Sequence, residues 1–91
     1  MTHRFTANII QNGDMDAAYV RIPIDIKKKY GKGRLKVQVT FDGEPYSGSV
    51  VNMGVKNADG SVCYIIGIPH AIRKKIGKSF GDSVEVEITP R

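Results

Sequence analysis

Apolar and polar residues alternate strictly in two segments of the chain, 35–40 and 84–89. A period of two indicates a strand that turns one face to the core and the other to water. Segments rich in β-branched and aromatic residues predict further strands at 4–11, 17–22, 46–53 and 61–68. Asn-Gly and Asp-Gly pairs at 12–13 and 42–43 supply turns between neighbouring strands. The pattern therefore predicts a chain built mainly of strands.

Each half of the chain also contains a short helical segment. Pro23 and Pro69 each end a strand and fix φ at a value suited to the first position of a helix. Apolar residues four apart then share one face, basic residues occupy the other faces, and Gly31 and Gly77 can end the helices in the left-handed conformation. The sequence predicts the first helix at Ile24–Tyr30 and the second directly after Pro69.

The order strand, strand, helix, strand occurs twice, and the two copies align with one another. The matched segments are 22–32 with 68–78, 35–40 with 84–89, and 6–11 with 47–52. A unit of about 45 residues is too small to bury its apolar face alone, so the two units are expected to share one core. We therefore predict a single all-β domain with two short helices over 1–91. Its expected form is a six-stranded barrel made of two pseudo-symmetric ββαβ repeats, 1–43 and 44–91.

Two motifs in the second half, IPHAIRKKIG at 68–77 and GDSVEV at 81–86, resemble the signature half of AbrB-type swapped-hairpin barrels. Those proteins usually dimerise to complete one barrel. With both halves in one chain, and with YSGSV at 46–50 and NMG at 52–54, the sequence more closely resembles an uncharacterised bacterial family called domain of unknown function 1905. The resemblance implies a double-split β-barrel capped by short helices, and it brings no known substrate. We expect a monomer rather than an obligate swapped dimer.

Composition narrows the class of protein further. The chain lacks the roughly 18 to 20 uninterrupted apolar residues of a membrane span, and its start lacks the apolar run of a secretory signal. The single Cys63 lies among apolar residues, which is typical of a buried free thiol in a reducing compartment. We therefore expect a cytoplasmic protein. Its net charge of +5 permits loose attraction to nucleic acid or anionic surfaces and equally favours solubility.

Each predicted helix carries a basic cluster. The members are Lys27, Lys28, Lys29 and Lys32 in the first and Arg73, Lys74, Lys75 and Lys78 in the second. In AbrB-type regulators a basic pair on this helix contacts DNA, and the resemblance aligns that pair with Lys27-Lys28 and Arg73-Lys74. These four residues are candidate contacts for nucleic acid or another anion. The arginine that those regulators carry on the preceding strand is replaced here by Tyr19 and Ile65. Helices at opposite ends of a barrel would also present no continuous stripe to a duplex, so we favour solvated helix faces.

Candidate catalytic and metal-binding residues are few. A structural zinc site needs about four closely spaced ligands, whereas His3 and His70 are the only histidines and Cys63 is the only cysteine. No nucleophile motif accompanies His70, which we interpret as a surface residue. Cys63 has apolar neighbours, so we interpret it as a structural thiol. The sequence predicts no enzyme, no metal site and no cofactor, and an enzyme that uses His70 or Cys63 is a third, less favoured hypothesis.

The second half departs most from the first around the loop 54–60. Loops on a rigid barrel commonly carry binding groups, so Tyr46, Met53, Gly54 and Asn57 are candidate residues of a ligand or partner loop. The alternative is a loop that merely differs in length. The first functional hypothesis is a non-catalytic binding module for a small molecule or protein. The second is an AbrB-like DNA-binding transcriptional regulator, in line with the half motif and the positive charge.

Overall fold

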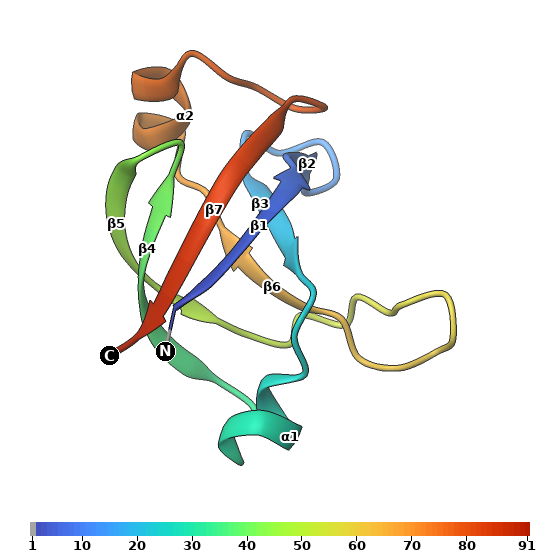
Figure 1. The fold of residues 1–91 in the computed structure, drawn as a ribbon. Helices are drawn as coiled ribbons and strands as arrows, with labels where there is room; N and C mark the ends of the chain where they lie inside the picture. The colour runs from blue at the N-terminus through green and yellow to red at the C-terminus, as the bar shows by residue number, and fades with distance from the viewer. Residues whose placement is uncertain (1) are drawn as a thin grey trace.

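Two β-sheets and two short helices make up residues 2–91, the part of the chain that the computed structural model describes. One sheet has the strand order β1-β7-β4-β5 and the other β2-β3-β6. The strands are β1 His3–Asn8, β2 Ile10–Gln11, β3 Ala18–Ile22, β4 Leu35–Phe41, β5 Glu44–Val50, β6 Tyr64–Gly67 and β7 Ser83–Pro90. The helices, α1 Ile26–Tyr30 and α2 His70–Ile76, lie at opposite ends of the molecule (Figure 1).

The prediction of a mainly β fold with two short helices is confirmed, and the prediction of a closed six-stranded barrel is not met. Residues 2–91 form seven strands in two sheets that do not join into one closed ladder. The predicted strand 4–11 is divided at Ile9 into β1 and β2. The predicted strands 46–53 and 61–68 are shorter, because the chain between β5 and β6 pairs only at two isolated bridges, Val51 with Ile65 and Lys56 with Val62.

The division at Ile9 occurs where the chain passes from one sheet to the other. The Ile9 N–H donates to the carbonyl of Asp82 at 2.9 Å, and the Ile9 carbonyl accepts from the Gly81 N–H at 2.7 Å. These two bonds hold Ile9 against the residues that directly precede β7. The next residue, Ile10, pairs instead with Tyr19 of β3. Successive residues of an extended chain direct their polar groups to opposite sides. The chain therefore bonds to the β7 side at Ile9 and to β3 at Ile10, where it passes from one sheet to the other.

The second half changes sheets at the aligned position. Val50 pairs with Leu35 of β4, and Val51 then bridges to Ile65 of β6. Val50 and Val51 are the residues that the sequence alignment matches with Ile9 and Ile10. The two halves therefore follow the same path.

The strand pairing at the centre of each sheet also agrees with an exchange of halves. In the alignment β1 corresponds to β5, and β4 corresponds to β7. Exchange of these counterparts turns the order β1-β7-β4-β5 into β5-β4-β7-β1, which is the same sheet read from its other edge. Val20 lies opposite Ile66, and Val39 lies opposite Ile88. Each of these residues is aligned with its own partner. The pairing is what the predicted repeats 1–43 and 44–91 require, and the duplication itself stays an interpretation of the sequence.

One hydrophobic core draws on both halves of the chain. Its residues include the inward side chains of β3, β4, β6 and β7, and Phe41 at the end of β4 is fully buried. The alternation seen at 35–40 and 84–89 matches the alternation of buried and exposed residues in β4 and β7. The two repeats therefore share one core, and each sheet contains strands of both.

The helix ends follow the predicted glycines, but α1 begins later than predicted. Gly31 and Gly77 end the helices with φ of 70° and 68°. Asp25 caps the start of α1, where its carboxylate accepts a hydrogen bond from the Lys28 N–H at 3.1 Å. Helix α1 therefore starts at Ile26, since the carboxylate satisfies a backbone donor there. In α2, Pro69 itself occupies the capping position.

Asp42 fastens the turn between β4 and β5 to β7 and to the segment that follows α2. Its carboxylate accepts from the Glu85 N–H at 2.8 Å and from the Lys78 ammonium at 2.6 Å. The hydrogen bond from Lys78, followed by the one from the Glu85 backbone, lowers the pKa of Asp42. A carboxyl group whose pKa is lower in the folded state stabilises the protein above its unfolded pKa, and this contribution is lost as pH falls through the folded pKa.

We expect Asp42→Asn to weaken the acid sensitivity of the fold. Asparagine tolerates the positive φ of 51° at this position and keeps an acceptor for Glu85, but it cannot titrate or pair with Lys78. The variant should be less stable than the parent near neutral pH and should lose less stability on acidification. Urea unfolding at about pH 7 and about pH 3 measures both quantities. An equal loss of stability on acidification in the two proteins would contradict the account.

Candidate functional site

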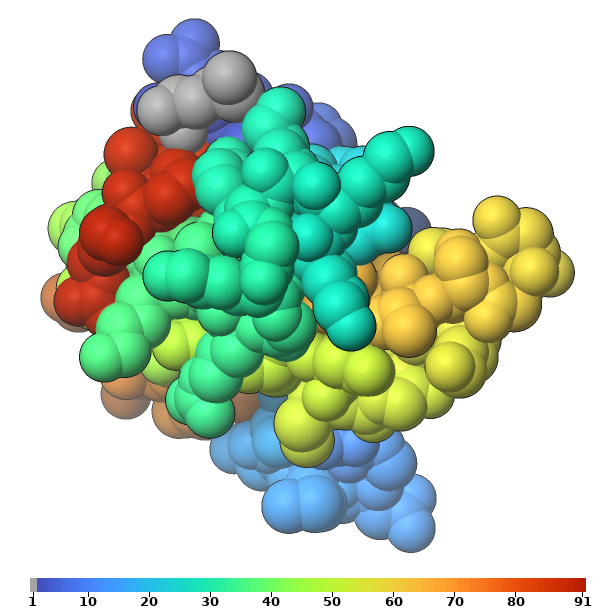
Figure 2. Space-filling model, turned by 90° about the horizontal axis from the view of Figure 1, so that it is seen from below, coloured from blue at the N-terminus to red at the C-terminus, as the bar shows by residue number. Residues whose placement is uncertain are grey.

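The candidate anion-binding residues lie at opposite ends of the molecule. Lys27 and Lys28 are exposed on α1, which crosses the middle of the end shown in Figure 2. Lys74 is exposed on α2, at the other end. The two basic clusters therefore form no common surface, as the sequence predicted.

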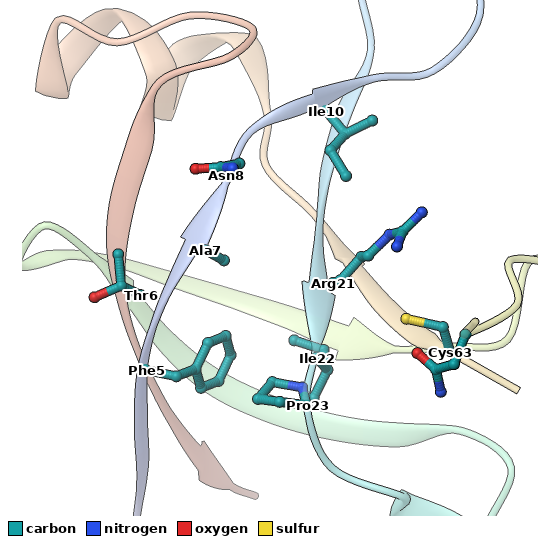
Figure 3. A pocket seen from close by; sticks show the side chains of 10 residues that line it. Phe5, Thr6, Ala7, Asn8, Ile10, Arg21, Ile22, Pro23 and Cys63 are labelled. Carbon is teal, nitrogen blue, oxygen red and sulfur yellow. The ribbon is translucent and has the colours of Figure 1, made fainter. Parts of the chain in front are cut away.

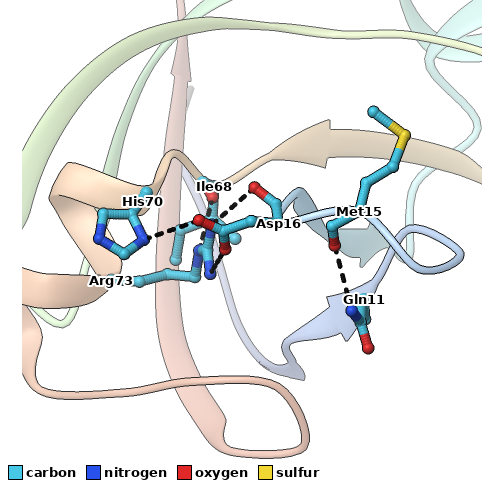
Figure 4. Close-up of polar contacts among 6 residues, drawn as sticks. All are labelled: Gln11, Met15, Asp16, Ile68, His70 and Arg73. Atoms are coloured by element: carbon cyan, nitrogen blue, oxygen red, sulfur yellow. Dashed lines mark hydrogen bonds and ion pairs between the residues drawn. The ribbon is translucent and has the colours of Figure 1, made fainter.

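Arg73 is a buried structural residue. The residue is 5 % exposed, and its guanidinium donates to the Ile68 carbonyl at 3.2 Å, to the Asp16 carboxylate at 3.1 Å and to the Asp16 carbonyl at 3.4 Å (Figure 4). It also lies 5.1 Å from the centre of the Phe80 ring. Arg73 therefore fastens the turn between β2 and β3 to α2. A guanidinium committed in this way is not available to a phosphate, which argues against Arg73 as a nucleic-acid contact.

Other polar residues near α2 are also engaged within the chain. The Nδ1 atom of the exposed His70 lies 3.2 Å from a carboxylate oxygen of Asp16. Lys75 pairs with Glu44 at 3.1 Å, and Lys78 pairs with Asp42. The α2 cluster is therefore partly neutralised by ion pairs.

The candidate ligand-loop residues do not form one site. Asn57 lines a groove between β1 and β3, while Tyr46 lines a different groove between β5 and β6. Met53 is exposed to 66 %, and Gly54 has a φ of 84° in the loop. The Asn57 side-chain amide donates to Ser61 Oγ and to the Val62 carbonyl. The loop is therefore held by its own hydrogen bonds, and only Asn57 reaches the groove described next.

The groove between β1 and β3 has a volume of about 360 Å³ (Figure 3). We call it the β1–β3 groove. The two strands converge toward Ile10 and separate toward Phe5 and Pro23, whose side chains point toward one another, while Arg21 and Cys63 lie beyond β3 as seen from β1. Its lining combines the apolar Phe5, Ala7, Ile10, Ile22, Pro23 and Cys63 with the polar Thr6, Asn8, Arg21 and Asn57. A small number of polar groups around an apolar floor is the usual composition of a ligand site.

Unpaired backbone groups line both sides of this groove. The polar groups of Ile9 face β7, so alternation along the strand directs those of Thr6 and Asn8 away from β7, toward β3. On β3, Ile68 donates to the Ala18 carbonyl and Val20 pairs with Ile66, so the backbone of Arg21 points the other way, toward β1. The hairpin pairing of β2 with β3 stops at Ile10 and Tyr19. The next pair along this hairpin, Asn8 with Arg21, is not formed, and both residues line the groove.

The second half contains a counterpart between β5 and β6. This β5–β6 groove, of about 400 Å³, is lined by the aligned residues Ser47, Gly48, Ser49 and Val51 together with Gly67, Arg34 and Arg91. The ring of Tyr46 lies so close to Gly48 that a Cβ added there would meet Tyr46 Cε2 at 2.8 Å. In the first half, Phe5 is aligned with Tyr46 and Ala7 is aligned with Gly48. Because Ala7 carries the Cβ that Gly48 lacks, the Phe5 ring cannot lie over its own strand as the Tyr46 ring does. The two grooves therefore differ in their floors.

Cys63 is buried, as predicted. The side chain is 3 % exposed and its thiol lies 3.7 Å from the Tyr64 carbonyl. Within residues 2–91, no three His, Cys, Asp or Glu side chains lie close enough together to hold a metal ion. No helix in that range has the length and apolar character needed to cross a bilayer.

His3 joins the first strand to α1. Its Nε2 lies 2.7 Å from the Tyr30 hydroxyl, and the two rings meet edge to face. Burial, followed by repulsion from Lys29, lowers the pKa of His3. Because the charged form is disfavoured in the folded protein, His3 adds to the loss of stability at acid pH.

Residues 5–88 match the family model described as Domain of unknown function (DUF1905). The chain belongs to the DUF1905 family. No curated protein matches the sequence. The DUF1905 match includes β3, β5, β6 and the part of β1 from Phe5 onward. The AbrB-like half motif and the bacterial origin stay predictions from the sequence.

Proposed function

We propose that this DUF1905 chain is a non-catalytic binding module whose β1–β3 groove holds a small molecule or a segment of another protein. The observation that carries the proposal is the unpaired backbone on both sides of an apolar floor. Water satisfies these groups in the open groove, and a ligand with its own donors and acceptors can replace that water. The second half, with Tyr46 against Gly48, offers a more polar groove.

The lining of the groove favours binding over catalysis. It contains neither a histidine nor a carboxylate, the side chains that most often transfer protons in enzymes. Cys63 lines the groove but is buried, and His70 lies at α2 beside Asp16. A nucleophile and a base are therefore not brought together there. This lining supports a binding role for the groove.

A fragment screen by NMR tests the binding proposal. We expect members of a library of small neutral and carboxylate-bearing fragments to shift the backbone amides of Thr6, Asn8, Arg21 and Cys63 in isotope-labelled protein. The amides of the β5–β6 groove serve as an internal control, because they occupy the aligned positions. Shifts confined to the β5–β6 groove, or a library without any binder, would refute the proposal.

The DNA-binding regulator is the second candidate. Lys27 and Lys28 support it, because they are exposed and have no ion-pair partner within 2–91. The burial of Arg73, the ion pairs around α2 and the separation of the two helices weaken it. Titration of mixed-sequence duplex DNA at two salt concentrations separates the candidates. Micromolar, salt-sensitive binding that Lys28→Glu abolishes would favour the regulator.

A further inference from the structure

Positive charge gathers at the β5–β6 groove. Its lining includes Arg34, which directly precedes β4, and Arg91, which directly follows β7. The Arg91 N–H donates to the Lys36 carbonyl at 3.0 Å, so Arg91 stands opposite Lys36 on the exposed face of the sheet. All three residues are exposed, and none forms an ion pair within residues 2–91. Like charges opposite one another destabilise a sheet, so this arrangement has an energetic cost.

The other half of the chain contains a matching pair of opposite sign. There the Asp42 N–H donates to the Glu85 carbonyl at 2.8 Å, just as the Arg91 N–H donates to the Lys36 carbonyl. Asp42 and Glu85 are therefore two acidic residues opposite one another. Their charge is partly balanced within the chain, because the carboxylate of Asp42 pairs with Lys78.

The basic pair lacks such a counterion in the described part of the chain. The residue that the sequence alignment matches with Lys78 is Lys32, which is a further cation. The lining of the β5–β6 groove contains no aspartate or glutamate. An anion bound in this groove would relieve the repulsion between Lys36 and Arg91, as Lys78 relieves it at the acidic pair.

Two unpaired backbone N–H groups also point into this groove. Val51 exchanges hydrogen bonds with Ile65 of β6, so alternation along β5 directs the N–H of Ser49 toward β6. Alternation from Ile65 likewise directs the N–H of Gly67 toward β5. The two strands pair only at the isolated bridge, and Ser49 and Gly67 both line the groove. Backbone N–H groups and guanidinium groups are the donors from which oxyanions accept hydrogen bonds.

The surroundings favour a small ligand over a polyanion. β5 and β6 come together at the bridge of Val51 with Ile65, and the groove between them has a volume of about 400 Å³. The carboxylates of Asp42 and Glu85 lie at the other end of the same sheet face. A nucleic acid that placed one phosphate at the groove and followed this face would meet them with further phosphates, and like charges repel.

We infer that the β5–β6 groove binds the phosphoryl group of a small molecule. Arg34 and Arg91 hold its oxygens, and the N–H groups of Ser49 and Gly67 donate to it. The planar fork of a guanidinium matches the geometry of a phosphate. The ring of Tyr46, which lines the same groove, offers an apolar surface to the rest of the ligand. The inference does not depend on the β1–β3 groove and goes beyond the proposed function.

A titration with phenyl phosphate tests the inference. At constant ionic strength, we expect the compound to shift the backbone amides of Ser49 and Gly67 to saturation, and we expect phenol to shift neither. Arg34→Ala should weaken binding about tenfold or more, because it removes charge-assisted hydrogen bonds. Lys74→Ala removes an equally exposed cation outside the groove and should leave the affinity unchanged. Equal effects of the two variants, or shifts that do not saturate, would overturn the inference.

Lys36→Glu gives a readout that does not depend on a ligand. It places a carboxylate opposite Arg91, so we expect a higher midpoint of urea unfolding together with weaker binding of phenyl phosphate. Lys74→Glu changes the net charge equally and should change neither quantity. A midpoint that stays the same or falls in Lys36→Glu would show that the basic pair needs no counterion.

The outcomes distinguish this inference from the proposed function. If fragments shift the β1–β3 amides but phenyl phosphate shifts neither Ser49 nor Gly67, the phosphoryl site is wrong and the binding module stands. If phenyl phosphate binds and no fragment shifts the β1–β3 amides, the phosphoryl site stands alone. If duplex DNA shifts Ser49 and Gly67 and phenyl phosphate does not, the groove contacts nucleic acid and the small-ligand inference fails.

Discussion

Phe41→Ala is expected to destabilise the protein by about 3–5 kcal/mol, the range for loss of a buried aromatic ring. Phe41 is fully buried at the end of β4, and its ring centre lies 6.4 Å from that of Tyr46. Removal of the ring leaves a cavity between the two halves, where β4 pairs with both β5 and β7. Since a small domain is stable by only about 5–15 kcal/mol, the variant should unfold at much lower urea concentration.

Phe5→Ala is the matched control for this prediction. The Phe5 ring is only partly buried and forms the wall of the β1–β3 groove. Its removal should cost less than half as much as the loss of Phe41, because water already reaches the site. Urea unfolding of both variants measures the difference. Equal losses would mean that the Phe5 ring is buried and that the groove is closed in solution.

Asp16→Asn is expected to destabilise the protein by about 2 kcal/mol, because it leaves the buried guanidinium of Arg73 without its carboxylate. Asparagine retains an oxygen that can accept the hydrogen bond now made at 3.1 Å, but it does not balance the charge. The expected loss is smaller than for a fully buried pair, since the Asp16 side chain is 66 % exposed.

Asp14→Asn, in the same turn, is the control. Asp14 is exposed and makes no ion pair within residues 2–91, so its replacement should change stability by less than about 0.5 kcal/mol. Thermal and urea unfolding of the two variants give the comparison. A similar effect of both substitutions would show that Arg73 does not depend on Asp16 for compensation.

Local sequence patterns predicted the elements that depend on nearby residues. Strict alternation at 35–40 and 84–89 indicated β4 and β7, and the Asp42-Gly43 turn and the glycine helix ends lie where they were expected. The point at which the chain changes sheets also left a signal that the strand prediction missed. Ile9-Ile10 and Val50-Val51 are adjacent apolar pairs that interrupt the period of two. In each pair the first residue joins one sheet and the second joins the other.

The candidate site depends on contacts that no local pattern encodes. Arg73 lies in a basic run similar to the one at Lys27, yet it is buried because the fold brings Asp16 to α2 from the turn before β3. The β1–β3 groove exists because Asn8 and Arg21 do not pair, and the absence of a pairing has no signature in the sequence. The sequence analysis selected candidate residues where the loop 54–60 departs from the internal symmetry of the chain. Of those candidates, only Asn57 lines this groove.

Amide hydrogen exchange tests most directly whether the β1–β3 groove is open. The account predicts an alternation along β1, in which the Thr6 and Asn8 amides exchange rapidly while the Phe5, Ala7 and Ile9 amides, directed toward β7, exchange slowly. On β3, the Arg21 amide should exchange rapidly and those of Val20 and Ile22 slowly. Equal protection of all these amides would mean that β1 and β3 are hydrogen-bonded to one another, and the open groove and the proposed function built on it would be wrong.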